Sequence, residues 1–253
     1  MADGGMHQVQ GRKMESASLI LLSRQTALER QMEVLANNVA NANTTAYKSQ
    51  QVSFETYVSE PKFGDKINFV VNRATLRNTT PGSTVNTGNE LDMALQGKGY
   101  FAVRTPQGVQ YTRAGSFVLD NDGNIVTQDG NQVLSAGGQA LNIPNDASAL
   151  HVDQTGRITT DKGEVGQLQV VNFAHEQDMV ETGHNLYQAS EKATPATDTK
   201  VAQGMIEQSN VNAVVEMTKV TEVVRAYQQT QTLLQNENDR IRNAVRVLGR
   251  VMA

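Results

Sequence analysis

The stretch LANNVANANTTAYK, residues 35–48, begins like a helix and ends like a turn. Leu35 and Val39 stand one helical turn apart, as a buried stripe requires. Asparagine is a mediocre helix former because its amide competes for nearby backbone groups, yet it recurs through this stretch. The other residues that mark the stretch are Asn37, Asn38, Asn41, Asn43, Thr44, Thr45, Tyr47 and Lys48. This composition predicts that a helix stops here.

Upstream of this stretch, apolar residues keep helical spacing from Leu19 to Ala42. The predicted stripe consists of Leu21, Leu28, Met32, Leu35 and Val39. It is narrow, like the seam of a coiled coil, and predicts an amphipathic helix of about two dozen residues. Residues 1–13 show no such periodicity and are expected to be a disordered leader or an upstream extension.

The C-terminal end of the chain repeats the pattern at greater length. A predicted seam contains Val220, Tyr227, Leu234, Ile241 and Leu248 at seven-residue spacing, with Val224 four residues after Val220. At about 1.5 Å per residue, a helix over 211–248 would be about 57 Å long. Ser209 and Asn210 are the predicted N-cap residues. Glutamine and asparagine amides flank the seam and can bond identical neighbours, so the pattern favours self-assembly somewhat over an isolated hairpin of helices.

Between the helices the apolar period changes to two, and turn residues multiply. Residues 100–103, 117–119, 125–127 and 168–173 read as strands, and 120–124 as a hairpin turn. The predicted fold is α+β, with long terminal helices in a coiled-coil-like layer and a central antiparallel all-β domain. The predicted domains are 14–49 (N-terminal helix), 50–83 (extended connector), 84–173 (central β domain), 174–208 (connector) and 209–253 (C-terminal helix).

Composition limits the classes of function. The chain has 253 residues, a net charge of −4 and no cysteine, which excludes disulfides and thiolate chemistry. No basic stretch is interleaved with aromatic residues, so no nucleic-acid partner is expected. No run approaches the roughly 18 to 20 apolar residues of a membrane span, and no classical signal peptide is evident.

The candidate chemical sites each have a simpler explanation. His175 begins like a zinc-protease helix, but Met179 occupies the place of the second histidine, so a surface histidine is favoured. The loop that starts at Asp120 lacks the calcium-loop glycine and glutamate and fits a hairpin turn better. We therefore expect no enzyme activity, catalytic residues, metal, cofactor or small-molecule substrate. A β-rich adhesin and an assembly-associated hydrolase remain the alternatives from other classes.

The stretch 35–48 resembles the N-terminal signature of flagellar rod and hook proteins. Ala46 replaces the glycine that usually precedes the aromatic-lysine step, which puts the backbone conformation there in question. The other blocks that resemble the family are 87–95 with 97–101, 111–117, and 208–212 with 215–217. Within the family, length and residues 18–25 point to a proximal-rod type, with the distal-rod type as the alternative and the hook protein as a poorer fit.

This resemblance implies a structural subunit of the periplasmic drive shaft of the bacterial flagellum. Its partners would be copies of itself, adjacent rod proteins and the flagellar (type III) export apparatus, with no cleaved signal peptide. The terminal helices would line the inner tube, and the β domain would lie outside them. The two seams would pack together, and the asparagines would serve where the first helix stops: asparagine tolerates the left-handed conformation there, and its amide can satisfy loose carbonyls or reach a neighbouring subunit.

Overall fold

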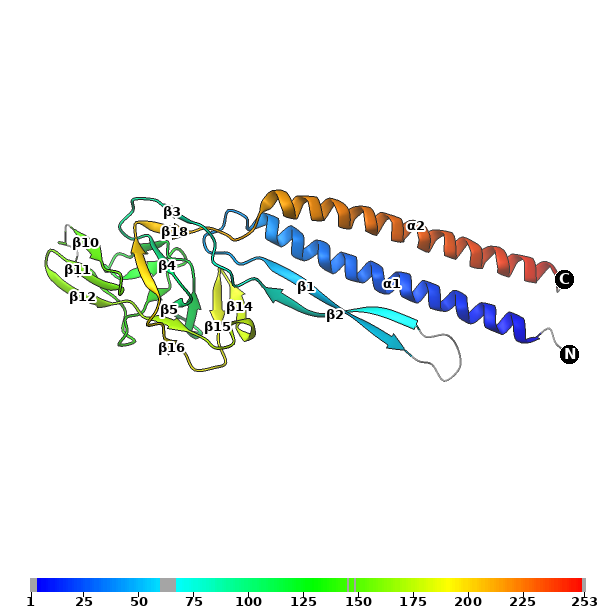
Figure 1. Cartoon of the computed structure of the whole chain (residues 1–253), viewed down its shortest axis with the longest axis horizontal. Helices are drawn as coiled ribbons and strands as arrows, with labels where there is room; N and C mark the ends of the chain where they lie inside the picture. The colour runs from blue at the N-terminus through cyan, green and yellow to red at the C-terminus, as the bar shows by residue number, and fades with distance from the viewer. Residues whose placement is uncertain (1–3, 60–66, 145, 148, 252–253) are drawn as a thin grey trace. The chain divides into compact units, whose positions relative to one another are not determined.

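The computed structural model describes residues 4–59, 67–144, 146–147 and 149–251 (Figure 1). They fall into two compact units. The helical unit holds the described residues of 1–39, 50–76 and 212–253, and the β unit holds those of 40–49 and 77–211. The chain is therefore α+β, with antiparallel strand pairs between a helix at each end.

The helical unit contains two long helices and a pair of strands among its described residues. Its elements are α1 (Gly4–Ala40), β1 (Gln50–Ser59), most of β2 (Ile67–Arg77) and α2 (Ala213–Val251). Figure 1 shows α1 and α2 side by side, and side-chain hydrogen bonds join them. The Gln25 amide donates to the Tyr227 hydroxyl at 2.9 Å, and the Asn38 amide donates to the Glu216 carboxylate at 3.0 Å. The helices are therefore antiparallel.

The described structure departs from the sequence expectations at the first helix and at both connectors. Residues 4–13 continue helix α1, because the stretch holds no proline and extends a helix already nucleated downstream; residues 1–3 lie outside the described residues. The expected connectors 50–83 and 174–208 contain strands. Residues such as Val52 and Phe54 alternate with polar ones along β1, which is the period of a half-exposed strand.

The start of α2 also differs from the expectation. The Asn212 side chain, not that of Ser209 or Asn210, caps the helix by accepting the Val215 N–H at 3.2 Å. Asn210 instead donates to the carbonyls of Asn78 and Thr80. An asparagine at either position satisfies the capping preference, so sequence spacing alone placed the helix start two or three residues too early.

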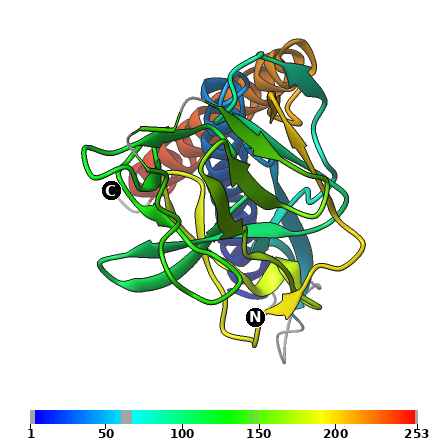
Figure 2. The ribbon, with the colours of Figure 1, turned by 90° about the vertical axis from the view of Figure 1, so that its left-hand side faces the viewer.

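The β unit is built from short antiparallel strands, which Figure 2 shows from a second direction. In the first half of the unit the strands are β3 (Thr84–Asn86), β4 (Met93–Gln96), β5 (Tyr100–Thr105), β6 (Gly108–Thr112), β7 (Phe117–Leu119), β8 (Ile125–Thr127), β9 (Gln132–Val133) and β10 (Leu150–Val152). In the second half they are β11 (Arg157–Thr160), β12 (Gly163–Gln167), β13 (Val170–Asn172), β14 (Val180–Gly183), β15 (Leu186–Gln188), β16 (Thr194–Pro195), β17 (Lys200–Gln203) and β18 (Met205–Glu207), with a 3₁₀ turn at Glu176–Asp178.

The largest sheet among the described residues has nine strands, with β5 at its centre. Its main path runs β14-β15-β6-β5-β9-β8-β7, while β13 joins β5 to β16. Smaller sheets pair β10, β11 and β12, and bring the late strands β17 and β18 onto the early strands β4 and β3. The C-terminal part of the β unit thus closes on its beginning, although more than 100 residues separate them.

Two hydrophobic clusters hold the β unit together. The larger includes Met93, Phe101, Phe117 and Ile125, and the Phe101 and Phe117 rings meet edge to face at 5.2 Å between centroids. The smaller gathers Tyr100, Val171, Phe173, Met179 and Tyr187. Burying each large side chain contributes about 1.5–3 kcal/mol, so these clusters are the main source of stability in this unit.

The predicted hairpin turn at 120–124 is confirmed, and the same construction recurs at Asp153. In each loop the first carboxylate accepts the N–H groups of the residues two and four positions later. A glycine with positive φ, Gly123 or Gly156, completes each turn. Hydrogen bonds from Asn124 and from Thr155 hold the pKa of Asp120 and of Asp153 below the ordinary value.

Gly115 is a position where the fold requires glycine. A Cβ atom built there would lie 1.6 Å from the Met93 carbonyl oxygen, because the Met93 N–H donates to the Gly115 carbonyl at 2.8 Å. We predict that Gly115→Ala lowers the free energy of unfolding by about 3 kcal/mol, since backbone must move to admit the methyl group. Denaturant unfolding followed by tyrosine fluorescence measures this loss. Gly137→Ala is the matched control because its nearest atom is 3.8 Å away, and an equal loss there would contradict the prediction.

Candidate assembly site

The predicted seam residues of α1 and α2 are buried to different depths. Leu35 is buried, whereas the other members whose side chains are described are partly exposed in this single chain. The partly exposed ones are Leu21, Leu28, Met32, Val39, Val220, Val224, Tyr227, Leu234 and Ile241. The side chain of Leu248 lies outside the described residues. A role for these residues in assembly stays a prediction.

Further buried positions of the helices lie beside the predicted ones. On α1 they include Val34 and Asn38, and on α2 they are Glu216, Val223 and Thr230. The α2 positions repeat every seven residues, as the predicted seam does, but three residues after its members Val220 and Tyr227. Sequence analysis missed Glu216 and Thr230 because a polar residue in a seam gives no hydrophobic signal.

Asn38 joins three segments of the helical unit. Its amide nitrogen donates to the Gln50 carbonyl at 2.8 Å and to the Glu216 carboxylate at 3.0 Å, and its oxygen accepts the Gln50 N–H at 2.9 Å. The side chain is 1% exposed. The amide therefore pairs with the first residue of β1 as a neighbouring strand would, and it anchors the first turns of α2. This explains one asparagine of the signature.

We predict that Asn38→Ala lowers the free energy of unfolding of the helical unit by about 2–3 kcal/mol. The change leaves the Gln50 backbone groups and one Glu216 oxygen without their Asn38 partner at a buried position. Amide exchange of Gln50 and of the first turns of α2 measures the loss. Asn37→Ala is the control, because Asn37 is exposed. Equal losses for Asn38→Ala and Asn37→Ala would show that the Asn38 hydrogen bonds do not stabilise the helical unit.

The left-handed residue of the signature is not an asparagine. Among the described non-glycine residues, positive φ occurs at Ala46 (57°), His184 and Asn185. The expectation that an asparagine adopts this conformation at the helix end is therefore wrong. Ala46 is held in this left-handed conformation by its backbone N–H, which donates to the backbone carbonyl of Glu207 at 2.8 Å. A left-handed alanine is strained by about 1–2 kcal/mol, and glycine at this position would be free of that strain.

A cluster of three buried charges follows the signature in the β unit. The Glu207 carboxylate accepts hydrogen bonds from the Lys48 ammonium, the Arg113 guanidinium at 2.6 Å and the Gly82 N–H at 2.9 Å. The side chains of Lys48, Arg113 and Glu207 are 3%, 5% and 1% exposed. Buried charges persist only when they are paired and fully hydrogen-bonded, and these are.

Backbone carbonyls complete this cluster. The Arg113 guanidinium donates to the carbonyls of Leu95, Gly97 and Gly99, and Lys48 donates to that of Thr80. The bend at 97–99 thus directs its carbonyls at Arg113, with Gly97 and Gly99 at positive φ. Burial by itself would raise the pKa of Glu207, but Arg113 and Lys48 outweigh it and hold that pKa below its ordinary value. Lys48 was singled out from the sequence, but the roles of Glu207 and Arg113 in this cluster were not.

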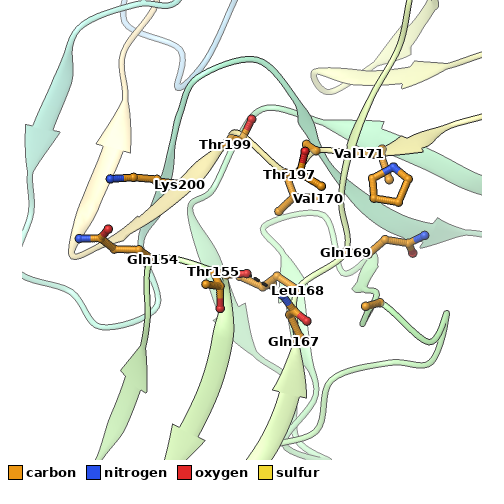
Figure 3. Close-up of a pocket in the computed structure, with 13 residues that line it drawn as sticks. Gln154, Thr155, Gln167, Leu168, Gln169, Val170, Val171, Thr197, Thr199 and Lys200 are labelled. Carbon is orange, nitrogen blue, oxygen red and sulfur yellow. Dashed lines mark hydrogen bonds between the residues drawn. The ribbon is translucent and has the colours of Figure 1, made fainter.

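A pocket of about 430 Å³ opens in the β unit beside Gln154, Leu168 and Lys200 (Figure 3). Its lining consists of amides, hydroxyls and aliphatic groups, with Lys200 as its one charged side chain and no aromatic ring. It therefore offers neither a catalytic pair of acid and base nor the aromatic platform of a glycan-binding adhesin. His175 is exposed and paired with Glu191, which confirms the surface histidine.

Among the described residues, no group of three or more histidine, cysteine, aspartate or glutamate side chains is placed to hold a metal ion. Within the same residues, no helix has both the length and the apolar composition that crossing a bilayer requires.

Comparisons with known families match both ends and the centre of the chain. Residues 19–48 match the family described as flagella basal body rod protein, 94–160 match the flagellar hook protein FlgE/F/G D1 domain, and 202–247 match the flagellar basal body rod FlgEFG protein C-terminal region. The matched segments include Lys48, Arg113 and Glu207, one in each.

Individual relatives agree with these families over almost the whole chain. The flagellar basal-body rod protein FlgF of Caulobacter vibrioides is 34% identical over 94% of this chain and 100% of its own length. FlgF of Mesorhizobium japonicum is 33% identical over 93% of this chain and 99% of its own, and FlgG of Agrobacterium fabrum is 32% identical over 82% and 90%. The chain belongs to the flagellar basal-body rod protein family and is of the FlgF type.

Proposed function

We propose that this chain is a structural subunit of the flagellar basal-body rod, which polymerises and transmits torque through its terminal helices. The relatives named as rod proteins support a mechanical role without catalysis. In this proposal the subunit sits in the proximal part of a periplasmic shaft. The distal rod is the alternative, since relatives named FlgG also match most of the chain.

The observation that carries this proposal is the exposed apolar surface of α2. Val214, Val245 and Val247 are 75%, 63% and 62% exposed, and Met217 and Leu233 are also exposed. A single helix pair cannot cover both sides of α2, so apolar area remains for other copies or neighbouring rod proteins. A contact of one copy with the next that does not close on itself builds a helical filament.

The coiled-coil-like layer and its seams belong to this proposal. Leu21, Leu28 and Leu35 of α1 would pack against Val220, Tyr227 and Leu234 of α2, in the antiparallel order that the Gln25–Tyr227 and Asn38–Glu216 bonds set. Neighbouring copies would cover the outer faces. The proposal also includes export of this chain through the flagellar apparatus without a cleaved signal peptide.

The chain lacks cysteine, so the proposal can be tested with single engineered thiols. We expect Leu233→Cys and Val245→Cys to form disulfides or short-linker cross-links between subunits in isolated basal bodies, because these exposed apolar positions of α2 would meet another subunit. Val109→Cys on β6 is the control: it is 46% exposed, but it lies away from the helices in sequence and unit.

The outcome separates the alternatives. Cross-links from α2 that appear in basal bodies and vanish in the dissociated chain support the rod subunit. Absence of the chain from purified basal bodies, with normal swimming after deletion of its gene, would contradict the proposal. Mass spectrometry of the cross-linked neighbours then distinguishes a proximal from a distal position.

A further inference from the structure

We infer that residues 44–49, the end of the signature and the serine that follows it, are an integral part of the β unit, where Glu207 clasps them in the free chain whether or not α1 is ordered. This inference goes beyond the rod function, because it concerns which residues are already folded in the chain before assembly. The segment continues directly from α1 in the sequence, so its assignment to the helix would be the simpler expectation.

Backbone hydrogen bonds tie the segment to distant parts of the β unit. The Ala46 N–H donates to the Glu207 carbonyl, the Asn210 N–H to the Tyr47 carbonyl and the Asn78 N–H to the Ser49 carbonyl. Side-chain amides add to these, since Asn210 accepts the Ser49 N–H and Asn185 donates to the Thr45 carbonyl. The segment is thus bonded on both sides, as an inner strand is.

Burial shows that the segment is part of the packed interior. Ala46, Tyr47, Lys48 and Ser49 are buried in succession, at 0%, 2%, 3% and 8% exposure. Helix residues of α1 alternate instead between buried and exposed positions. Four consecutive buried residues require partners on every side, and the β unit supplies them.

The charge cluster couples the folding of residues 44–49 to that of the β unit. Lys48 brings a positive charge into a site where Glu207 and Arg113 already bond, and Gly82 supplies a further donor to the same carboxylate. If the segment leaves, the Glu207 carboxylate loses the hydrogen bond from Lys48 and keeps those from Arg113 and Gly82. The clasp therefore fixes the chain just after α1, and on the N-terminal side of the clasp only residues before about position 40 belong to the helical unit.

Amide hydrogen exchange on the full-length, monomeric chain tests the inference. We expect residues 44–49 to be protected to the same degree as β5 (Tyr100–Thr105), whatever the protection of α1. Lys48→Met keeps the length of the side chain and removes its charge. It should speed exchange at Ala46, Tyr47 and Ser49 about tenfold or more. Lys98→Met, the same change at an exposed lysine, should leave both segments unaltered.

Each exchange pattern either supports or overturns the inference about residues 44–49. Selective loss at 44–49 in Lys48→Met supports the clasp, and so does a joint loss at 44–49 and β5, because a segment docked loosely on a folded unit could not unfold it. Exchange of 44–49 at the rate of an unstructured peptide in the unaltered chain would overturn the inference. Full protection of this segment in Lys48→Met would also overturn it.

Discussion

Replacing Glu207 by alanine is expected to unfold the β unit at moderate denaturant concentration, with a loss of about 3–5 kcal/mol in the free energy of unfolding. The change removes the carboxylate that neutralises both Lys48 and Arg113, and it leaves those two like charges buried near each other. Because small domains are stable by only about 5–15 kcal/mol, this is a large fraction of the total.

Tyrosine fluorescence during denaturant unfolding measures the effect, since the β unit contains Tyr47, Tyr100, Tyr111 and Tyr187 and the chain has no tryptophan. Glu164→Ala is the control. That glutamate also pairs with an arginine, Arg157, but both side chains are more than half exposed, so the loss should stay below about 1 kcal/mol. Equal losses at the two positions would show that burial of the Glu207 pair is irrelevant.

The same residue gives a pH dependence with a defined sign. The folded-state pKa of Glu207 lies below the ordinary value of 4.5. The contribution of Glu207 to the free energy of unfolding is therefore fully present above pH 4.5. It is lost as the pH falls through the folded-state pKa, when the carboxyl is protonated beside Lys48 and Arg113. The unaltered chain should therefore lose stability on acidification more steeply than Glu207→Gln, which cannot titrate at this position.

The fold was largely predictable where one physical signal dominates. Helical spacing located α1 and α2, and alternation with turn residues located β5, β7 and β8. The strands β14 to β18 were missed because they are two to four residues long and are defined by partners far away in the sequence, such as β4 for β17. A strand of that length carries too few residues to show a period by itself; β7 and β8 are equally short, but the turn signal at 120–124 between them marked the hairpin.

The site was predictable only in part, for a related reason. Lys48 and the asparagines stand in one conspicuous stretch, but Arg113 and Glu207 are single charges without any local pattern. Their meeting is a consequence of sheet topology, because β18 pairs with β3 and so brings Glu207 opposite Thr84. Likewise, nothing near Asn38 in the sequence reveals that Glu216 is its partner.

The largest effect on assembly is expected from a charge in the helix seams. We predict that Leu28→Asp or Leu234→Asp reduces incorporation into rods about 100-fold or more and abolishes swimming. Both leucines are partly covered in the single chain and would be covered fully by packed helices. An unpaired carboxylate costs several kcal/mol at such a position, and about 2.7 kcal/mol already corresponds to 100-fold.

Gln235→Asp is the matched control for Leu234→Asp. It places the same charge one residue further along α2, at an exposed position, and should retain most of the swimming. Folding of the variants is checked by tyrosine fluorescence of the β unit, which lies outside the changed helices. If Leu234→Asp folds and still supports rods and swimming, the helix seam is not what holds one subunit to the next, and the exposed face of α2 would have to carry that contact alone.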